Sequence, residues 1–213
     1  MSNDKLNSAK LRAVKALAEG GDRAAQSELA RRLVRRKQKE EALAWFQSAA
    51  ESGDPEQQME LGIVLFWDHA AYNQGIKWIR LAAEQGHVGA QYFLGSALAL
   101  GENIGKNLRE AARWYRRAAR QGHSEAQYNL ALMYWAGEGV PRSSSAAHRW
   151  LEKAAQARDL LALRALSEAY EMGLLGYRRN PVRAVYWKKR YSQVHRTHRK
   201  YAGKRATTTP PVR

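Results

Sequence analysis

Tryptophan recurs along this chain at an almost constant interval, and this recurrence is the strongest constraint on the fold. The five residues are Trp45, Trp78, Trp114, Trp150 and Trp187, and they are separated by 33, 36, 36 and 37 residues. Self-similarity with a period of about 20 to 50 residues is typical of arrays of repeated structural units. The sequence therefore predicts an array in which each unit packs mainly on its neighbours.

Each tryptophan lies within a pattern that is typical of a helix. The pattern has a small residue, the tryptophan, two alanines and a glycine, as in Ala111, Trp114, Ala118, Ala119 and Gly122. The first four share one face of a helix, and glycine is favoured just after a helix ends. In the fourth copy Arg158 replaces the glycine. We expect the tryptophans to be core residues on these helices.

Another helical pattern alternates with the first one along the chain. Its clearest copy is Ala126, Leu130, Ala131, Tyr134 and Gly137. In two other copies Gly62 and Gly95 lie inside the helix, where glycine costs about 1 kcal/mol relative to alanine, so we expect close helix crossings there. The predicted organisation is a capping helix in residues 1–21, five helix pairs in residues 22–195 and a basic tail in residues 196–213, partly disordered.

Residues 124–155 resemble the Sel1-like repeat family, which is related to the tetratricopeptide repeats. The resemblance implies an all-α, right-handed α/α superhelical solenoid. It also implies scaffold, adaptor and regulatory roles in protein complexes, mostly in bacteria, with no shared catalytic site.

The net charge is the second strong feature of the sequence. The chain has 36 Lys and Arg against 20 Asp and Glu, a formal charge of +16. Residues 172–213 hold 12 Lys and Arg and no acidic residue. Such asymmetry suggests an acidic partner, which could be nucleic acid, an anionic membrane surface or the acidic face of a protein.

The first helix of each pair is expected, from the resemblance, to line the concave face of the solenoid. The positions two, six and nine residues after the first small residue of these helices are apolar or aromatic in the middle of the array and charged at its ends. The predicted partner-binding residues are Met59, Ile63, Phe66, Tyr92, Ser96, Tyr128, Leu132, Trp135, Arg164 and Glu168. Aromatic side chains are common anchors of protein interfaces. The alternative is that these side chains pack between adjacent first helices or under a curled terminus of the chain.

A basic patch follows the last tryptophan. It consists of Lys188, Lys189, Arg190, Arg196, Arg199 and Lys200. Tyr191 and His195 are interleaved with it, and such a mixture suits phosphate contacts and base stacking. An acidic protein surface suits the patch equally well, and a patch with no specific role is the third possibility.

No residue pattern indicates catalysis, a cofactor or a metal site. The chain has no cysteine, which excludes disulfides and thiol nucleophiles and fits the cytoplasm. Its N-terminal residues are charged throughout, so we expect no secretory signal. The predicted function is a non-enzymatic adaptor or inhibitor of a partner protein, for example an immunity protein that neutralises a bacterial toxin. The alternative is a nucleic-acid-binding accessory protein that acts through the basic segment.

Overall fold

The computed structural model describes residues 2–36, 38–67, 71–101 and 104–206, with the backbone alone for residues 2–9 and 200–206. Within these ranges the chain forms eleven helices and no strand. The chain divides into two compact units, which we call the N-terminal unit (Met1–Leu94) and the C-terminal unit (Gly95–Arg213). Each is described by itself below.

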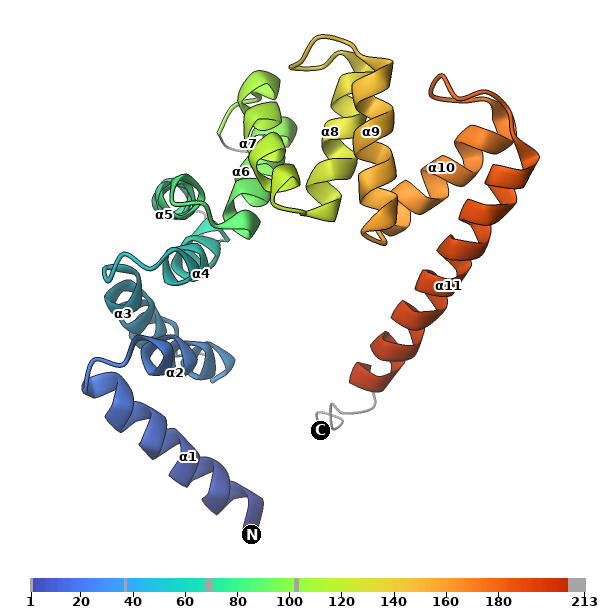
Figure 1. Cartoon of the computed structure of the whole chain (residues 1–213). Coiled ribbons are helices and arrows are strands. Elements are labelled where there is room, and N and C mark those ends of the chain that lie inside the picture. The colour runs from blue at the N-terminus through green and yellow to red at the C-terminus, as the bar shows by residue number, and fades with distance from the viewer. Residues whose placement is uncertain (1, 37, 68–70, 102–103, 207–213) are drawn as a thin grey trace. The chain divides into compact units, whose positions relative to one another are not determined.

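The N-terminal unit holds one single helix followed by two helix pairs. Its helices are α1 (Ser2–Glu19), α2 (Arg23–Arg35), α3 (Lys39–Ala50), α4 (Pro55–Phe66), α5 (Tyr72–Glu84) and the first half of α6 (Val88–Leu100). Consecutive helices pack side by side from α1 to α5 (Figure 1). Helix α1 occupies the place that the sequence predicts for a cap.

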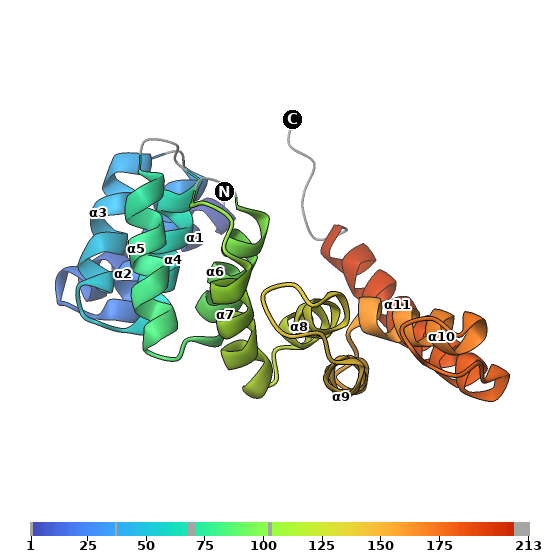
Figure 2. The same cartoon turned by 90° about the horizontal axis from the view of Figure 1, so that it is seen from above.

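The C-terminal unit continues the pattern of helix pairs and ends in a long helix. After the second half of α6 come α7 (Leu108–Arg120), α8 (Ser124–Ala136), α9 (Ser144–Gln156), α10 (Leu160–Met172) and α11 (Pro181–Ala206). Helix α11 packs along α10 (Figure 2) and is twice as long as the other helices of the unit. The predicted all-α array of helix pairs is confirmed. The predicted basic tail begins inside α11, and residues 207–213 lie outside the described residues.

Small residues form the contact surfaces between helices. The paired alanines that follow each of the first four tryptophans are almost completely inaccessible to solvent. These pairs are Ala49 and Ala50, Ala82 and Ala83, Ala118 and Ala119, and Ala154 and Ala155. Leu166 of the next helix lies in the same buried cluster as Ala154 and Ala155, and Leu94 and Leu130 are also fully buried. The helix face predicted from the sequence is therefore the buried face.

The tryptophans only partly meet the expectation that they are core residues. Trp114 is buried at 6% exposure, whereas Trp45, Trp78, Trp150 and Trp187 are half-buried. In three repeats a basic residue one turn later lies over the indole ring, at 4.6 Å for Arg117 over Trp114, 4.9 Å for Lys153 over Trp150 and 5.8 Å for Arg190 over Trp187. The other four indoles pack against the buried clusters but keep part of their surface exposed, so the prediction holds fully for Trp114 alone.

The predicted close crossing is confirmed at Gly62, whereas Gly95 makes room for an aromatic side chain of the next helix. A Cβ atom built on Gly95 would lie 2.8 Å from Cδ1 of Tyr115, and one built on Gly62 would lie 3.0 Å from the carbonyl oxygen of Gly75. Gly62 therefore lets two helix backbones approach closely, and Gly95 gives the ring of Tyr115 its place against α6.

Candidate functional site

The predicted groove residues of the N-terminal unit are mostly committed to internal packing. Met59 is only 8% exposed. The ring of Phe66 lies in an aromatic cluster, with centroids 4.7 Å from Tyr72 and 4.8 Å from Phe93. Ile63 and Tyr92 are half-buried. Met59 is therefore not available to a partner, whereas Ile63, Phe66 and Tyr92 keep part of their surface exposed.

One exposed aromatic residue of the N-terminal unit was not among the predicted groove residues. Trp67 follows the last residue of α4, is 74% exposed and meets the ring of Phe66 edge-on at 5.2 Å. The repeat pattern does not include this position, so the sequence offered no signal beyond the residue type.

The C-terminal unit places three of the predicted groove residues on one face of α8. Tyr128, Leu132 and Trp135 are separated by four and three residues, so they share a face of the helix. Leu132 is 38% exposed, and the other two side chains are half-buried. This face is therefore an apolar surface that remains open to solvent at its centre.

The two aromatic residues of this face are held in place by their surroundings. Tyr128 packs against the buried cluster that includes α10. Burial raises the pKa of its phenol, the charges of Asp159 and Glu168 raise it further, and the charge of Arg164 lowers it. Trp135 lies beneath the guanidinium of Arg142, 5.2 Å from its ring centroid. Rigid aromatic side chains of this kind suit an interface because little entropy is lost when a partner binds.

The remaining groove residues of the C-terminal unit have different roles. The hydroxyl of Tyr115 donates a hydrogen bond to Oγ of Ser96 at 3.1 Å, so Ser96 joins α6 to α7. Arg164 and Glu168 are exposed on α10 and form an ion pair with an N–O distance of 3.8 Å. They supply charge near Tyr128, as its pKa reflects.

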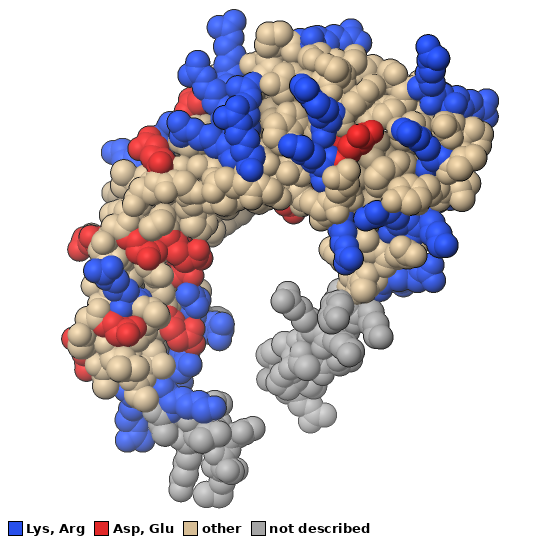
Figure 3. Space-filling view, in the orientation of Figure 1, with Lys and Arg blue, Asp and Glu red and all other residues tan. Residues whose placement is uncertain are grey.

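The net positive charge belongs almost entirely to the C-terminal unit. The N-terminal unit has 13 Lys and Arg against 12 Asp and Glu, whereas the C-terminal unit has 23 against 8. Figure 3 shows basic side chains spread over the visible face of α7 to α11, while acidic and basic side chains alternate over α2 to α4. An acidic partner would therefore be attracted to the C-terminal unit.

The predicted basic patch lies on α11. Lys188, Lys189, Arg196 and Arg199 are exposed, and Arg190 is half-buried. The side chain of Lys200 lies outside the described residues. The four exposed members fall on one side of the helix, since Lys189 and Arg196 are seven residues apart and Lys188 and Arg199 are eleven apart, whereas Arg190 lies on another side.

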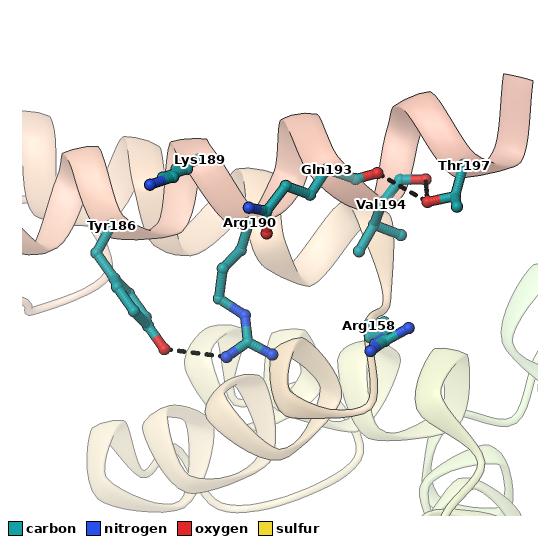
Figure 4. A pocket seen from close by; sticks show the side chains of 7 residues that line it. All are labelled: Arg158, Tyr186, Lys189, Arg190, Gln193, Val194 and Thr197. Carbon is teal, nitrogen blue, oxygen red and sulfur yellow. Dashed lines mark hydrogen bonds between the residues drawn. The ribbon is translucent and has the colours of Figure 1, made fainter.

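One side of α11 forms a basic pocket of about 420 Å³ with the turn that precedes α10 (Figure 4). Its polar lining residues are Arg158, Tyr186, Lys189, Arg190, Gln193 and Thr197. Nη1 of Arg190 donates a hydrogen bond to the phenol oxygen of Tyr186 at 3.0 Å, which holds this guanidinium at the pocket. Of this set, Lys189 and Arg190 belong to the predicted basic patch, whereas Arg158 stands out in the sequence only as a departure from the repeat.

Arg158 has a backbone conformation that few residues other than glycine adopt. Its φ angle is 66°, in the left-handed region. The equivalent turns of the earlier repeats have glycine there, namely Gly21, Gly53, Gly86 and Gly122, with φ between 85° and 99°. The turn itself is unchanged, because the amide of Asp159 still bonds to the carbonyl of Ala154 at 3.0 Å, as that of His123 bonds to Ala118 at 3.1 Å. The arginine is therefore an addition that the turn does not require.

Within the described residues, no three or more His, Asp or Glu side chains are grouped closely enough to hold a metal ion. In the same part of the chain, no helix combines the length and the apolar character that a membrane span needs.

Comparisons with known proteins agree with this architecture. The family model described as "Sel1 repeat" matches residues 24–54, 69–87, 88–123, 124–159 and 160–189. A Sel1 repeat protein from Oxalobacter formigenes is similar in structure, with 26% identity over 86% of this chain and 78% of that chain and a TM-score of 0.74. No curated protein sequence matches the chain at a significant level.

Two further solved structures are similar. The chain is 30% identical to c5321, a protective antigen present in uropathogenic Escherichia coli strains, over 86% of this chain but only 40% of that protein, with a TM-score of 0.78. The immunity protein Pa5087 from Pseudomonas aeruginosa is 18% identical over 86% of this chain and 73% of that chain, with a TM-score of 0.55. At that identity the likeness concerns the fold alone.

Proposed function

Since the chain belongs to the Sel1 repeat family, whose repeats mediate protein–protein interactions, we propose that it is a non-enzymatic adaptor or inhibitor of an acidic partner protein. The observation that carries this proposal is the apolar face of α8, where exposed Leu132 lies between the fixed aromatic side chains of Tyr128 and Trp135. Interfaces depend on a few anchors of this kind, surrounded by polar residues.

The charge distribution supports an acidic partner. The C-terminal unit has an excess of 15 basic residues, whereas the N-terminal unit has an excess of one. Charge complementarity of this size raises association rates at low ionic strength and disfavours basic competitors. The apolar face would then determine how long the complex lasts, since most affinity differences between related complexes are differences in dissociation rate.

One version of this proposal is an immunity protein that blocks a bacterial toxin. The likeness to the immunity protein from Pseudomonas aeruginosa is compatible with it through the fold that the two chains share. A repeat surface of this kind suits an inhibitor that acts by covering its target. The test of this version is protection of cells that express a candidate toxin.

The competing function is nucleic-acid binding through α11. The observation that favours it is that residues 172–206 contain no acidic residue, while Tyr191 and His195 stack on each other at 5.5 Å beside exposed Lys188 and Arg196. Binding of this kind weakens steeply as the salt concentration rises. An affinity that falls about a thousandfold between about 50 mM and 200 mM salt would favour nucleic acid.

The test of protein binding uses two matched substitutions of exposed leucines. Leu132→Asp places a charge in the centre of the α8 face, and Leu81→Asp places one on α5, where Leu81 is 45% exposed. We expect Leu132→Asp to abolish capture of the partner from a lysate of the source cells and Leu81→Asp to leave it intact. Capture that survives Leu132→Asp would contradict the proposed surface. Circular dichroism of both variants is the control that checks whether the helices remain folded.

A further inference from the structure

We propose that the pocket between Arg158 and α11 binds a phosphate group in its doubly charged form, as carried by a phosphomonoester. This site is separate from the α8 face and does not depend on the protein-binding function. Its three cationic side chains are Arg158, Lys189 and Arg190.

The first observation is the backbone of Arg158. The left-handed conformation strains any residue with a Cβ atom, and four equivalent turns of the same chain avoid the strain with glycine. Strained residues persist where the strain serves a function. Here the strained position directs a guanidinium into the pocket beneath α11 (Figure 4). A glycine at this position would close the turn equally well but would leave the pocket with two cations.

The second observation is the arrangement of donors on α11. Tyr186, Lys189, Arg190 and Gln193 lie on one side of the helix at the spacing of successive turns. The phenol of Tyr186 accepts a hydrogen bond from Arg190, so its own hydroxyl hydrogen is free to donate. The hydroxyl of Thr197 donates to the carbonyl of Gln193 at 2.7 Å and can only accept from a ligand. The pocket is therefore lined mainly by donors.

The third observation is that no carboxylate lines this pocket among the described residues. The acid next to it in the sequence is Asp159, whose Oδ1 accepts a hydrogen bond from the backbone N–H of Ala162 at 2.8 Å and caps α10. Arg158 and Lys189 form no ion pair within the described part of the chain. Their charges are left for a ligand.

The charge of the pocket favours phosphate over a carboxylate or a phosphodiester. Three cations suit a compact dianion, and a phosphomonoester carries a charge of about −1.5 to −2 at pH 7 with three acceptor oxygens. A carboxylate or a phosphodiester carries one negative charge. Two guanidinium groups can also bind phosphate oxygens in pairs, which adds geometric selectivity.

The test is calorimetric titration of the whole chain with four probes. The probes are inorganic phosphate, a phosphoserine peptide, the same peptide with glutamate in place of phosphoserine, and a single-stranded oligonucleotide. We compare the natural chain with Arg158→Gly, with Lys189→Gln and with Arg149→Gln, a control that removes the same charge from an exposed position on α9. We expect phosphate and the phosphoserine peptide to bind, and Arg158→Gly to weaken both about tenfold, as the loss of one charge-assisted hydrogen bond does.

Each outcome decides the proposal. Equal losses in Arg158→Gly and Arg149→Gln would show general electrostatic attraction and overturn it. The proposal is also overturned if the glutamate peptide or the oligonucleotide binds more tightly than the phosphoserine peptide. It is likewise overturned if neither phosphate nor the phosphoserine peptide binds. Since glycine suits the turn, Arg158→Gly is expected to fold, and Lys189→Gln tests the pocket with the turn unchanged. Similar affinity for free phosphate and the phosphoserine peptide indicates a small phosphorylated ligand as the source, whereas much tighter binding of the peptide indicates a phosphorylated protein.

Discussion

Gly75 of α5 lies directly against the backbone of α4 at Gly62. A Cβ atom built on Gly75 would lie 2.8 Å from the carbonyl oxygen of Gly62 and 2.6 Å from the amide nitrogen of Phe66. Real Cβ atoms do not approach backbone atoms this closely. The second helix pair is therefore held together at a point where neither helix carries a side chain.

Gly75→Ala is expected to destabilise the protein, although alanine is the better helix former. The added methyl group would force two backbones apart, and overpacking of this kind costs about 1 to 3 kcal/mol. Urea unfolding measures the change. The control is Gly89→Ala in α6, where a Cβ atom would meet only the ring of His87, at 3.2 Å. We expect its effect to stay within about 1 kcal/mol. Equal effects of the two substitutions would contradict the close crossing.

Arg158→Gly is expected to stabilise the fold. Glycine adopts the left-handed conformation without the clash of a Cβ atom, which costs other residues about 1 to 2 kcal/mol. Part of this gain is lost because glycine makes the unfolded chain more flexible. We therefore expect a net gain of about 1 kcal/mol and a higher melting temperature. A lower melting temperature would mean that the side chain of Arg158 supports the fold, and the pocket would then not explain its presence.

His123→Asn is expected to remove part of the dependence of stability on pH. His123 caps α8, with its Nδ1 accepting the N–H of Ala126 at 3.4 Å, which only a ring unprotonated at Nδ1 can do. Burial lowers the pKa of His123, although the nearby carboxylates of Glu125 and Asp159 act in the opposite direction. Because the pKa of His123 is lowered in the folded state, its contribution to the free energy of unfolding is complete above the unfolded pKa of about 6.5. That contribution is lost as the pH falls below this value.

Asparagine caps helices well and does not titrate. Unfolding by urea at pH 7.5 and pH 5.5 should therefore show a larger fall in stability for the natural chain than for His123→Asn. The other histidines contribute equally to both proteins and cancel in the comparison. An identical fall in both would show that the cap survives protonation of the ring.

The architecture was predicted well from the sequence because residues close together in the chain define each repeat. The alanine pairs recur in four repeats, the turn glycines in three of them and the interior glycines in two, and each pattern reports a local requirement. The burial of Trp45, Trp78, Trp150 and Trp187 was predicted less well, since helical spacing identifies a face but not the depth of a large side chain on it. The repeat pattern likewise did not predict the basic side chains that lie over three of the indole rings.

The candidate site was harder to predict because it depends on contacts between distant segments. Periodicity places Ser96 and Leu132 at equivalent positions, yet Ser96 accepts a hydrogen bond from Tyr115 whereas Leu132 is exposed. The basic patch was predicted as a stretch of sequence. Its pocket arises only where α11 meets Arg158, and nothing in the local pattern pairs those two segments.

The most direct test of the proposed function is a hydrogen-exchange footprint of the captured partner on the whole chain. The account predicts slower exchange on binding in the first helices α8 and α10, around Leu132 and Arg164, with little change in the second helices α7 and α9. Protection confined to α7 and α9, around Trp114 and Trp150, would contradict it, because the partner would then bind the face that carries the tryptophans.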